Sequence, residues 1–251
     1  MQPSTQSPCR PTLEQLLTVF QESVESGYLS QPPSRSRTRF YQRLFSPLVV
    51  LWAMVYQRLN EDHTCDGVVS YLASGKADPL DEKHHQPLSQ RMKSESNSAY
   101  CQARRRLPLQ VFSEALRGTA EVSRKWLGSA ADWLGHPVAL LDGSTIALRG
   151  WPELATHYGQ ATNQHGTAYW VLLRVVVAFS AFTGALQAVA EGPERTSEAA
   201  LTPQVLANGV PGTLYVGDSN FGIYSVVQAA VHFGMHVLVR LTAPRAGKVA
   251  G

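Results

Sequence analysis

Cysteine and long apolar runs are scarce in this 251-residue sequence. Its three cysteines, Cys9, Cys65 and Cys101, lie far apart and form no Cys-x-x-Cys pair. This spacing indicates neither a zinc knuckle nor a disulfide framework and favours a reducing cytosol. The most apolar segment, residues 169–182, carries Arg174 and is too short to span a bilayer. The N-terminus lacks the pattern of a secretory signal, so we expect a soluble, cytoplasmic protein.

Acidic residues are absent after Asp218, and charged residues make up only 16% of the chain. The net charge of +3 hides an uneven distribution, because residues 1–130 carry 16 Lys and Arg against 12 Asp and Glu. Such an excess is weak support for nucleic-acid binding by itself. Two local basic clusters are more informative: Arg35, Arg37 and Arg39, and the run Arg104, Arg105 and Arg106. Each cluster is equally compatible with a solvated basic surface.

Two aspartates stand at the ends of short apolar runs. Residues 138–141 (VALL) lead into Asp142, and residues 214–217 (LYVG) lead into Asp218. This pattern predicts two buried strands that each deliver a carboxylate to a sheet edge. Carboxylates on neighbouring strands can share a divalent cation, because its charge offsets their mutual repulsion. Either aspartate is also compatible with a simple Asx turn or helix cap.

The first half of the chain has helical periodicity. Thr12 and Gln15 have the spacing of a capping box, and Ser46-Pro47 is typical of a helix start. The predicted helices cover residues 12–26, 46–59, 64–73, 98–107 and 109–127. Residues 30–39 are predicted to form an exposed linker and residues 76–93 a loop. We expect the Trp and Tyr side chains to fill the core.

After residue 135 the pattern changes to alternating strands and helices. The predicted strands cover residues 138–148, 169–180, 184–190, 213–217 and 235–241, and the helices cover 196–207 and 221–233. This order is typical of an α/β fold with mixed strand pairing. We expect an N-terminal helix and basic linker (1–39), a helical, DNA-binding region (40–134) and a mixed-sheet domain (135–251).

Five motifs occur in a fixed order along the chain: FSPLVVLWAMVYQR at 45–58, SAYCQAR at 98–104, LDGST at 141–145, TSE at 196–198 and GDSNFG at 217–222. Together they resemble bacterial insertion-sequence transposases of the DDE type, within the IS-four group. The resemblance covers residues 40–241. It implies a ribonuclease-H-like catalytic domain after the helical region. It also implies DNA-mediated transposition by a protein associated with the bacterial nucleoid.

The resemblance also implies a mechanism and a site. In this family three acidic residues hold two Mg²⁺ or Mn²⁺ ions, which support in-line attack of water, and later of a 3′-hydroxyl, on a phosphodiester. Asp142 matches the first family acid and Asp218 the second. The family's third acid is a glutamate on a later helix, and no match to its motif precedes Gly251. We therefore expect an incomplete domain, a truncated copy without the third catalytic acid.

Further residues are predicted to assist. Glu198 matches the helix that carries a metal-binding glutamate in ribonuclease H, although an acid there is also typical of a helix start. Arg104 matches a family arginine. Its neighbours Arg105 and Arg106 are candidates for phosphate contacts, as are Arg35, Arg37 and Arg39. The implied partners are double-stranded DNA, namely terminal inverted repeats and a target site, and a second copy or a full-length transposase.

Two other functions are compatible with these residues. One is a non-catalytic DNA-binding or dimerising fragment that interferes with a full-length transposase. The other is a general nuclease that uses Asp142, Glu198 and Asp218.

Overall fold

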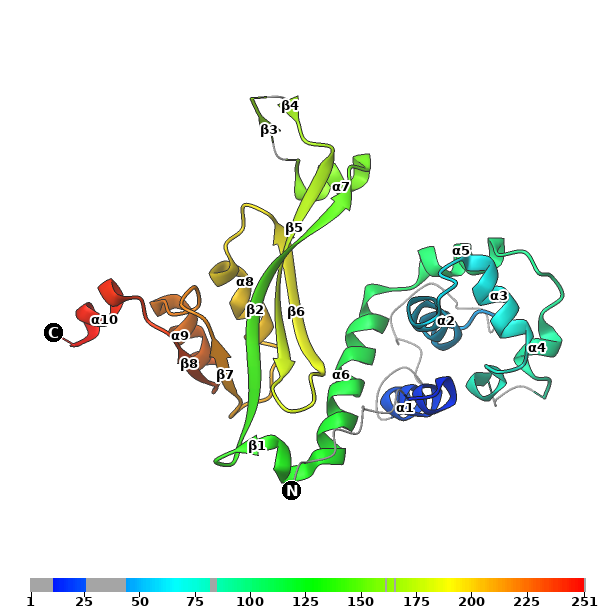
Figure 1. Cartoon of the computed structure of the whole chain (residues 1–251), viewed down its shortest axis with the longest axis horizontal. Helices are drawn as coiled ribbons and strands as arrows, with labels where there is room; N and C mark the ends of the chain where they lie inside the picture. The colour runs from blue at the N-terminus through cyan, green and yellow to red at the C-terminus, as the bar shows by residue number, and fades with distance from the viewer. Residues whose placement is uncertain (1–10, 26–43, 82–84, 161, 165, 251) are drawn as a thin grey trace, which may run out of the picture. The chain divides into compact units, whose positions relative to one another are not determined.

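The computed structural model describes residues 11–25, 44–81, 85–160, 162–164 and 166–250. The chain divides into two compact units, Met1–Val122 and Ser123–Gly251, and we describe each by itself. The described part of the first unit is helical, whereas the second is built on a mixed β-sheet (Figure 1). The expected basic linker, with Arg35, Arg37 and Arg39, lies outside the described residues.

The helices of the first unit begin within one residue of the predicted positions, except for α4, which was not predicted. They are α1 (Leu13–Glu25), α2 (Pro47–Leu59), α3 (Cys65–Ala73), α4 (Leu88–Arg91), α5 (Ser98–Arg106) and the first part of α6 (Leu109–Leu127). Thr12 and Gln15 form a reciprocal capping box, because each side chain accepts from the other's backbone N–H, at 2.8 and 3.3 Å. Ser46 caps α2 through the backbone N–H of Val49, at 3.3 Å. These caps satisfy N–H groups that a helix start leaves unpaired.

Aromatic side chains contribute to the core of this unit, together with Val, Leu and Ala side chains. Trp52 is fully buried and its indole N–H donates to the Tyr71 hydroxyl at 3.0 Å. Tyr71 also stacks on Tyr56, with ring centroids 3.7 Å apart. Burial raises the pKa of the Tyr71 hydroxyl, as expected for a phenol removed from water. This hydrogen bond lets the core enclose the Trp52 indole without leaving its N–H unpaired.

The prediction of a loop at 76–93 was wrong in part. The 3₁₀ helix η2 (Asp78–Asp81) and α4 lie inside this segment. Leu80 and Leu88 are buried, so the polar segment is anchored by two apolar side chains. The Asp78 carboxylate accepts from the backbone N–H and the hydroxyl of Ser89, both at 2.8 Å. This long-range pairing is not visible in local composition.

A mixed sheet forms the second unit, in the order β6-β5-β2-β7-β8. Its strands are β2 (His136–Arg149), β5 (Trp170–Ser180), β6 (Leu186–Pro193), β7 (Leu214–Gly217) and β8 (His236–Val239), with the short β1 (Asp132–Trp133) beside β2. β2, β5 and β6 pair antiparallel, whereas β7 and β8 run parallel to β2. The predicted order of strands and helices is confirmed, and so is the mixed pairing.

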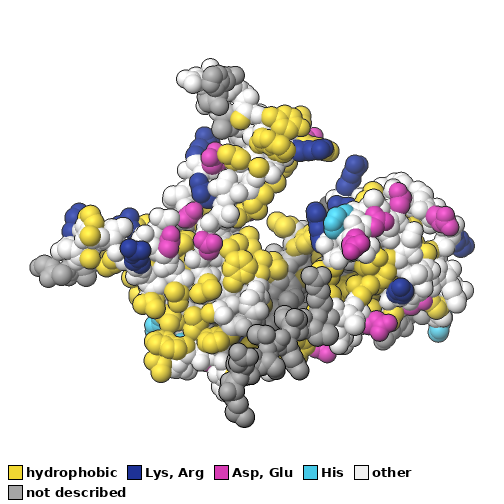
Figure 2. All heavy atoms as spheres, viewed as in Figure 1, with side chains coloured by type: hydrophobic (Ala, Val, Ile, Leu, Met, Phe, Trp, Pro, Cys, Tyr) yellow, Lys and Arg dark blue, Asp and Glu magenta, His cyan; other side chains and the backbone are white. Residues whose placement is uncertain are grey.

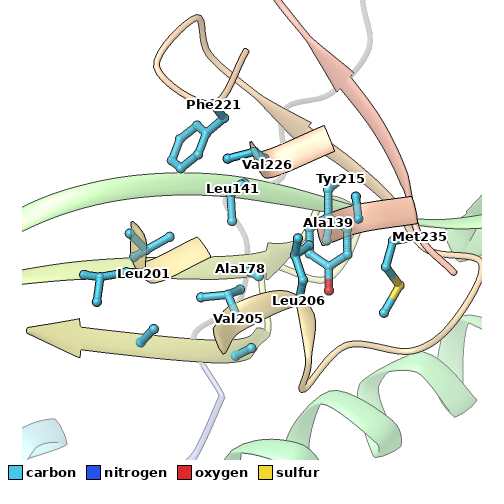
Figure 3. Packing of buried hydrophobic residues seen from close by; sticks show 14 residues of the cluster. Ala139, Leu141, Ala178, Leu201, Val205, Leu206, Tyr215, Phe221, Val226 and Met235 are labelled. Atoms are coloured by element: carbon cyan, nitrogen blue, oxygen red, sulfur yellow. The ribbon is translucent and has the colours of Figure 1, made fainter. Parts of the chain in front are cut away.

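Helices α8 (Glu198–Leu206) and α9 (Tyr224–His232) pack against the sheet. Figure 3 shows Ala139, Leu141, Ala178 and Tyr215 from the strands packed among side chains of the two helices. Alternate residues of a strand point to opposite faces. Leu141 therefore faces these helices, and Asp142 points to the other face.

The β2–β5 hairpin extends beyond β6 (Figure 1). Its connection holds α7 (Pro152–Tyr158) and the small strands β3 (Thr162–Asn163) and β4 (Gly166–Thr167), none of which the sequence analysis predicted. α10 (Ala243–Ala250) was also missed, as was the 3₁₀ helix η3 (Gly128–Ala131). These elements are short, and short elements carry too little periodicity for detection from sequence.

The expectation that Trp side chains fill the core was wrong for four of them. Trp52 is buried, whereas Trp126, Trp133, Trp151 and Trp170 are each about half exposed or more, at 60, 53, 58 and 48%. Figure 2 shows hydrophobic side chains gathered over the part of the sheet unit where α9, β7 and β8 lie. Among the described residues, no helix combines the length and apolarity that a membrane span requires.

Candidate active site

The two aspartates lie on neighbouring parallel strands. Leu141 of β2 pairs in register with Gly217 of β7, and Asp142 and Asp218 are the next residues on their chains. Neighbouring strands lie about 4.8 Å apart, so Asp142, which lies within β2, stands beside Asp218, which follows the end of β7. Both side chains are exposed. The two residues are therefore neighbours, but β2 continues past Asp142 to Arg149, so only Asp218 follows the end of its strand.

Each carboxylate makes one local hydrogen bond. Asp142 Oδ1 accepts from the backbone N–H of Gly143 at 2.9 Å, and Asp218 Oδ1 accepts from that of Asn220 at 2.8 Å. The second contact is an Asx turn, which holds the Asp218 carboxylate at the strand end. Among the described residues neither Oδ2 atom accepts a hydrogen bond. Each aspartate thus keeps one carboxylate oxygen available for a ligand.

The loop after β7 is fixed from two sides. Phe221 is buried in the sheet core, and its ring packs against Gly217, where an added Cβ would lie only 3.0 Å from the ring. Arg245 of α10 donates through Nη1 to the carbonyl oxygens of Ser219 and Gly222, at 2.7 and 3.2 Å. Arg245 therefore positions the loop that carries Asp218. No local sequence pattern marks this contact, because it joins residues more than 20 positions apart.

Glu198 reaches β2 from the helix-covered face. Ser197 caps α8, and the Glu198 carboxylate lies over Gly143, where an added Cβ would be 2.2 Å from its carboxyl carbon. Residues 142 and 143 of a regular strand point to opposite faces. Glu198 and Asp142 consequently lie on opposite sides of the sheet. A glycine at 143 is what admits the glutamate so close to the strand.

Arg174 is the partner of Glu198. Its Nη1 lies 3.4 Å from Glu198 Oε1, and its Nη2 donates to the Glu194 carbonyl oxygen at 3.5 Å. Arg174 Nε is buried and has no hydrogen-bond partner among the described residues. In the sequence, Arg174 is distinguished only as a charge inside an apolar run. Arg174 pairs with Thr145 of β2, so its side chain lies on the sheet face that α8 covers. Its positive charge therefore compensates the negative charge of Glu198 on that face.

The donor set suits a hard divalent cation but is incomplete. Carboxylate oxygens are the ligands that Mg²⁺ and Mn²⁺ prefer, and Asp142 and Asp218 offer them from adjacent strands. Among the described residues, however, no three His, Cys, Asp or Glu side chains gather as a metal site. The structure therefore brings together two of the three acids that the sequence analysis singled out.

The arginines of α5 differ in their surroundings. Arg104 points into the helical unit, where Nη1 donates to Gln57 Oε1 at 3.2 Å and its guanidinium carbon lies 5.6 Å from the Tyr100 ring centroid. Arg105 and Arg106 are exposed, and Arg106 donates to Gln102 at 2.9 Å. Arg104 therefore has a packing role, and only its two neighbours are presented to solvent. Arg35, Arg37 and Arg39 lie outside the described residues.

A comparison with protein-family models gives no match for this chain, and a comparison with curated protein sequences gives none either.

Proposed function

We propose that this chain is a DNA transposase of the DDE type, with a ribonuclease-H-like catalytic domain. The observation that carries the proposal is the aspartate pair, Asp142 and Asp218, directly after the Leu141–Gly217 register pair of two parallel strands. The strand order supports it as well. The central strand β2 pairs antiparallel with β5 on one side and parallel with β7 on the other. The ribonuclease-H-like fold that the motif resemblance implies has this strand arrangement.

The reaction under this proposal is transfer of a DNA phosphodiester. Asp142 and Asp218 would hold Mg²⁺ or Mn²⁺ through their carboxylate oxygens. A divalent cation at such a site lowers the pKa of bound water and stabilises negative charge on phosphoryl oxygens. The contribution of the chain itself is to hold both carboxylates in register, through β2 and through the loop fixed by Arg245.

DNA is the proposed partner of both units. Arg105 and Arg106 are exposed at the end of α5 and are available for phosphate contacts, whose strength falls with salt. The specific substrates would be terminal inverted repeats and a target site. A second copy or a full-length transposase would be the protein partner, and the chain would act at chromosomal DNA in the nucleoid.

Metal binding provides the direct test, independent of activity. Titration of the full chain with Mn²⁺, followed by electron paramagnetic resonance, should show a site that Asp142→Asn and Asp218→Asn each weaken at least tenfold, about 1.4 kcal/mol. Glu194→Gln is the matched control, because Glu194 is an exposed acid in the turn before α8. Equal Mn²⁺ affinity of all four proteins would contradict the proposed site.

A second candidate function is a non-catalytic DNA-binding or dimerising protein that interferes with a full transposase. The absence of a third acid beside the aspartate pair, among the described residues, favours it. Nicking of terminal-repeat DNA with Mg²⁺ that disappears in Asp142→Ala would support transposase chemistry. Salt-dependent DNA binding without nicking, unchanged by Asp142→Ala, would support the second candidate. Cleavage lost on Glu198→Gln, without preference for element ends, would instead indicate a general nuclease.

A further inference from the structure

The three parallel strands β2, β7 and β8 each lead into a charged residue at one level of the sheet (Figure 1). The register pair Leu141–Gly217 continues across β7 to Val239 of β8. The residues that follow these three are Asp142, Asp218 and Arg240. Because neighbouring strands lie about 4.8 Å apart, Arg240 stands one strand beyond Asp218 and two strands beyond Asp142. A cation therefore flanks the aspartate pair on the side of β8.

The burial pattern of β8 shows which face of the sheet Arg240 occupies. Val237 and Val239 pack against the core under the helices, whereas Leu238 and Arg240 are exposed. This is the alternation of a strand, whose successive side chains point to opposite faces. Arg240 consequently lies on the face opposite α8 and α9, which is also the face of Asp142.

Packing fixes the backbone of Arg240 against the loop that carries Asp218. A Cβ added to Gly222 would lie 2.7 Å from the Arg240 carbonyl oxygen, so glycine permits this close approach. Arg245 Nη1 donates to the carbonyl oxygen of the same Gly222, at 3.2 Å. The segments that follow β7 and β8 are therefore joined, and the cation and the carboxylate are held on one rigid edge.

The positive charge of Arg240 is not neutralised within the part of the chain that the structure describes. Its guanidinium makes no ion pair or hydrogen bond with any described residue. No Asp or Glu follows Asp218 in the sequence, so α9, β8 and α10 contribute no carboxylate. An arginine that only compensated the charge of Asp218 would contact its carboxylate. Arg240 is instead available to an anionic ligand.

We propose that Arg240 binds a backbone phosphate of DNA beside the phosphodiester held at Asp142 and Asp218, so that the strand crosses β2, β7 and β8 in turn. This inference rests on the proposed function, which makes DNA the ligand. A guanidinium suits a phosphate, because two of its N–H groups can donate to two phosphate oxygens. The contact would fix the path of the strand and offset its repulsion by the aspartates.

DNA binding by the full chain without divalent ions tests this contact independently of activity. Fluorescence anisotropy with a labelled duplex of arbitrary sequence, in EDTA, gives the slope of log K against log salt. Each phosphate contact contributes about 0.9 to that slope, so Arg240→Gln should reduce it by about one and weaken binding several-fold. Arg195→Gln, at an exposed arginine in the turn before α8, is the matched control and should change neither value. An unchanged slope for Arg240→Gln would overturn the proposed contact.

The aspartates provide a comparison of opposite sign. Without a divalent ion, Asp142→Asn removes negative charge beside the same DNA strand and should tighten binding, whereas Arg240→Gln should weaken it. Circular dichroism verifies that each variant folds. Weaker DNA binding by Asp142→Asn than by the wild type would overturn the arrangement of phosphate and aspartates.

Mn²⁺ titration separates this inference from the proposed function. Arg240→Gln should retain the Mn²⁺ site, because Arg240 is not a ligand. A Mn²⁺ site that Asp142→Asn weakens, together with an unchanged salt slope for Arg240→Gln, would support the proposed function and overturn the phosphate contact. A reduced slope for Arg240→Gln, with Mn²⁺ affinity that Asp142→Asn leaves unchanged, would support the phosphate contact and contradict the metal site.

Discussion

At the scale of single residues, Tyr215 is a buried phenol without a partner. Its side chain is 1% exposed, its hydroxyl oxygen has no hydrogen-bond partner among the described residues, and burial raises its pKa to about 12. A buried unpaired hydroxyl costs roughly 1–3 kcal/mol. The sheet core therefore contains one unpaired hydroxyl group among the described residues, and this hydroxyl lies beside Gly209.

Tyr215→Phe should raise the free energy of unfolding by about 1 kcal/mol, because it removes this unpaired hydroxyl and keeps the ring. The gain should grow between pH 10 and 12. The pKa of Tyr215 is raised in the folded state, so its protonated form is favoured below pH 10 and that contribution is lost as the pH rises through about 12. Urea denaturation at pH 7 and pH 11 measures both effects. A less stable variant at pH 7 would show that the hydroxyl is satisfied in solution.

Tyr100→Phe is the matched comparison and should have the opposite sign at neutral pH. Tyr100 is equally buried, but its hydroxyl donates to Gln57 Oε1 at 3.2 Å. Loss of that bond should reduce the free energy of unfolding of the helical unit by about 1 kcal/mol. Circular dichroism during urea denaturation at pH 7 checks it. Burial also raises the pKa of Tyr100 to about 12, so both variants should lessen alkaline unfolding.

At the scale of elements, α1 and α6 approach each other through a glycine. A Cβ on Gly118 would lie 1.9 Å from the carbonyl oxygen of Ser23, a backbone atom that cannot turn aside. Gly118→Ala should therefore lower the free energy of unfolding by about 2 kcal/mol, although alanine favours helices. Gly247→Ala in α10 is the control, since open space surrounds that position. It should be neutral or stabilising in the same thermal melts.

Local signals predicted most of the elements. Helix caps and short apolar runs extend over only three or four residues, so they can be recognised in the sequence. The caps are those at Thr12 and Ser46, and the apolar runs are those before Asp142 and Asp218. The elements that were missed depend on distant contacts. α4 is held by Asp78 and the buried Leu88, and α7 belongs to a hairpin connection without apolar periodicity.

The candidate site was predictable only in part, for a geometric reason. Asp142 and Asp218 each follow the last register pair between β2 and β7, so register alone brings them together. Glu198 was selected because its helix matches the one that carries a metal-binding glutamate in ribonuclease H. In the structure Glu198 lies over Gly143, and residues 142 and 143 of β2 point to opposite faces, so Glu198 and Asp142 are on opposite sides of the sheet. Arg245 and Arg174 act through carbonyl oxygens and an ion pair that no local pattern encodes.

At the scale of the whole molecule, the sheet exposes apolar side chains on the face opposite α8 and α9. Alternation along the strands puts Leu140, Ile146, Val189 and Leu238 on that face, and each is at least 40% exposed. Contiguous apolar patches beyond a few hundred Å² are uncommon on monomers and promote association. β8 adds an edge strand beside this surface.

We expect the isolated chain to self-associate as its concentration rises. The double substitution Leu140→Lys with Leu238→Lys should shift sedimentation velocity profiles toward the monomer, because charges on that face are costly to bury. Leu109→Lys, at an exposed leucine of α6, should leave the profile unchanged. A wild-type chain that sediments as a monomer at every concentration would contradict this expectation.

The pairing of β2 with β7 also determines when the sheet can close during synthesis. β2 can form its hairpin with β5 soon after residue 180 leaves the ribosome, but its other edge needs residues 214–217. At roughly 5–20 residues per second, those residues arrive about 2–7 s later. Throughout that interval the strand that bears Asp142 has one open edge. Nascent chains would be most vulnerable to mispairing then, while the helical unit, already synthesised, is free to fold.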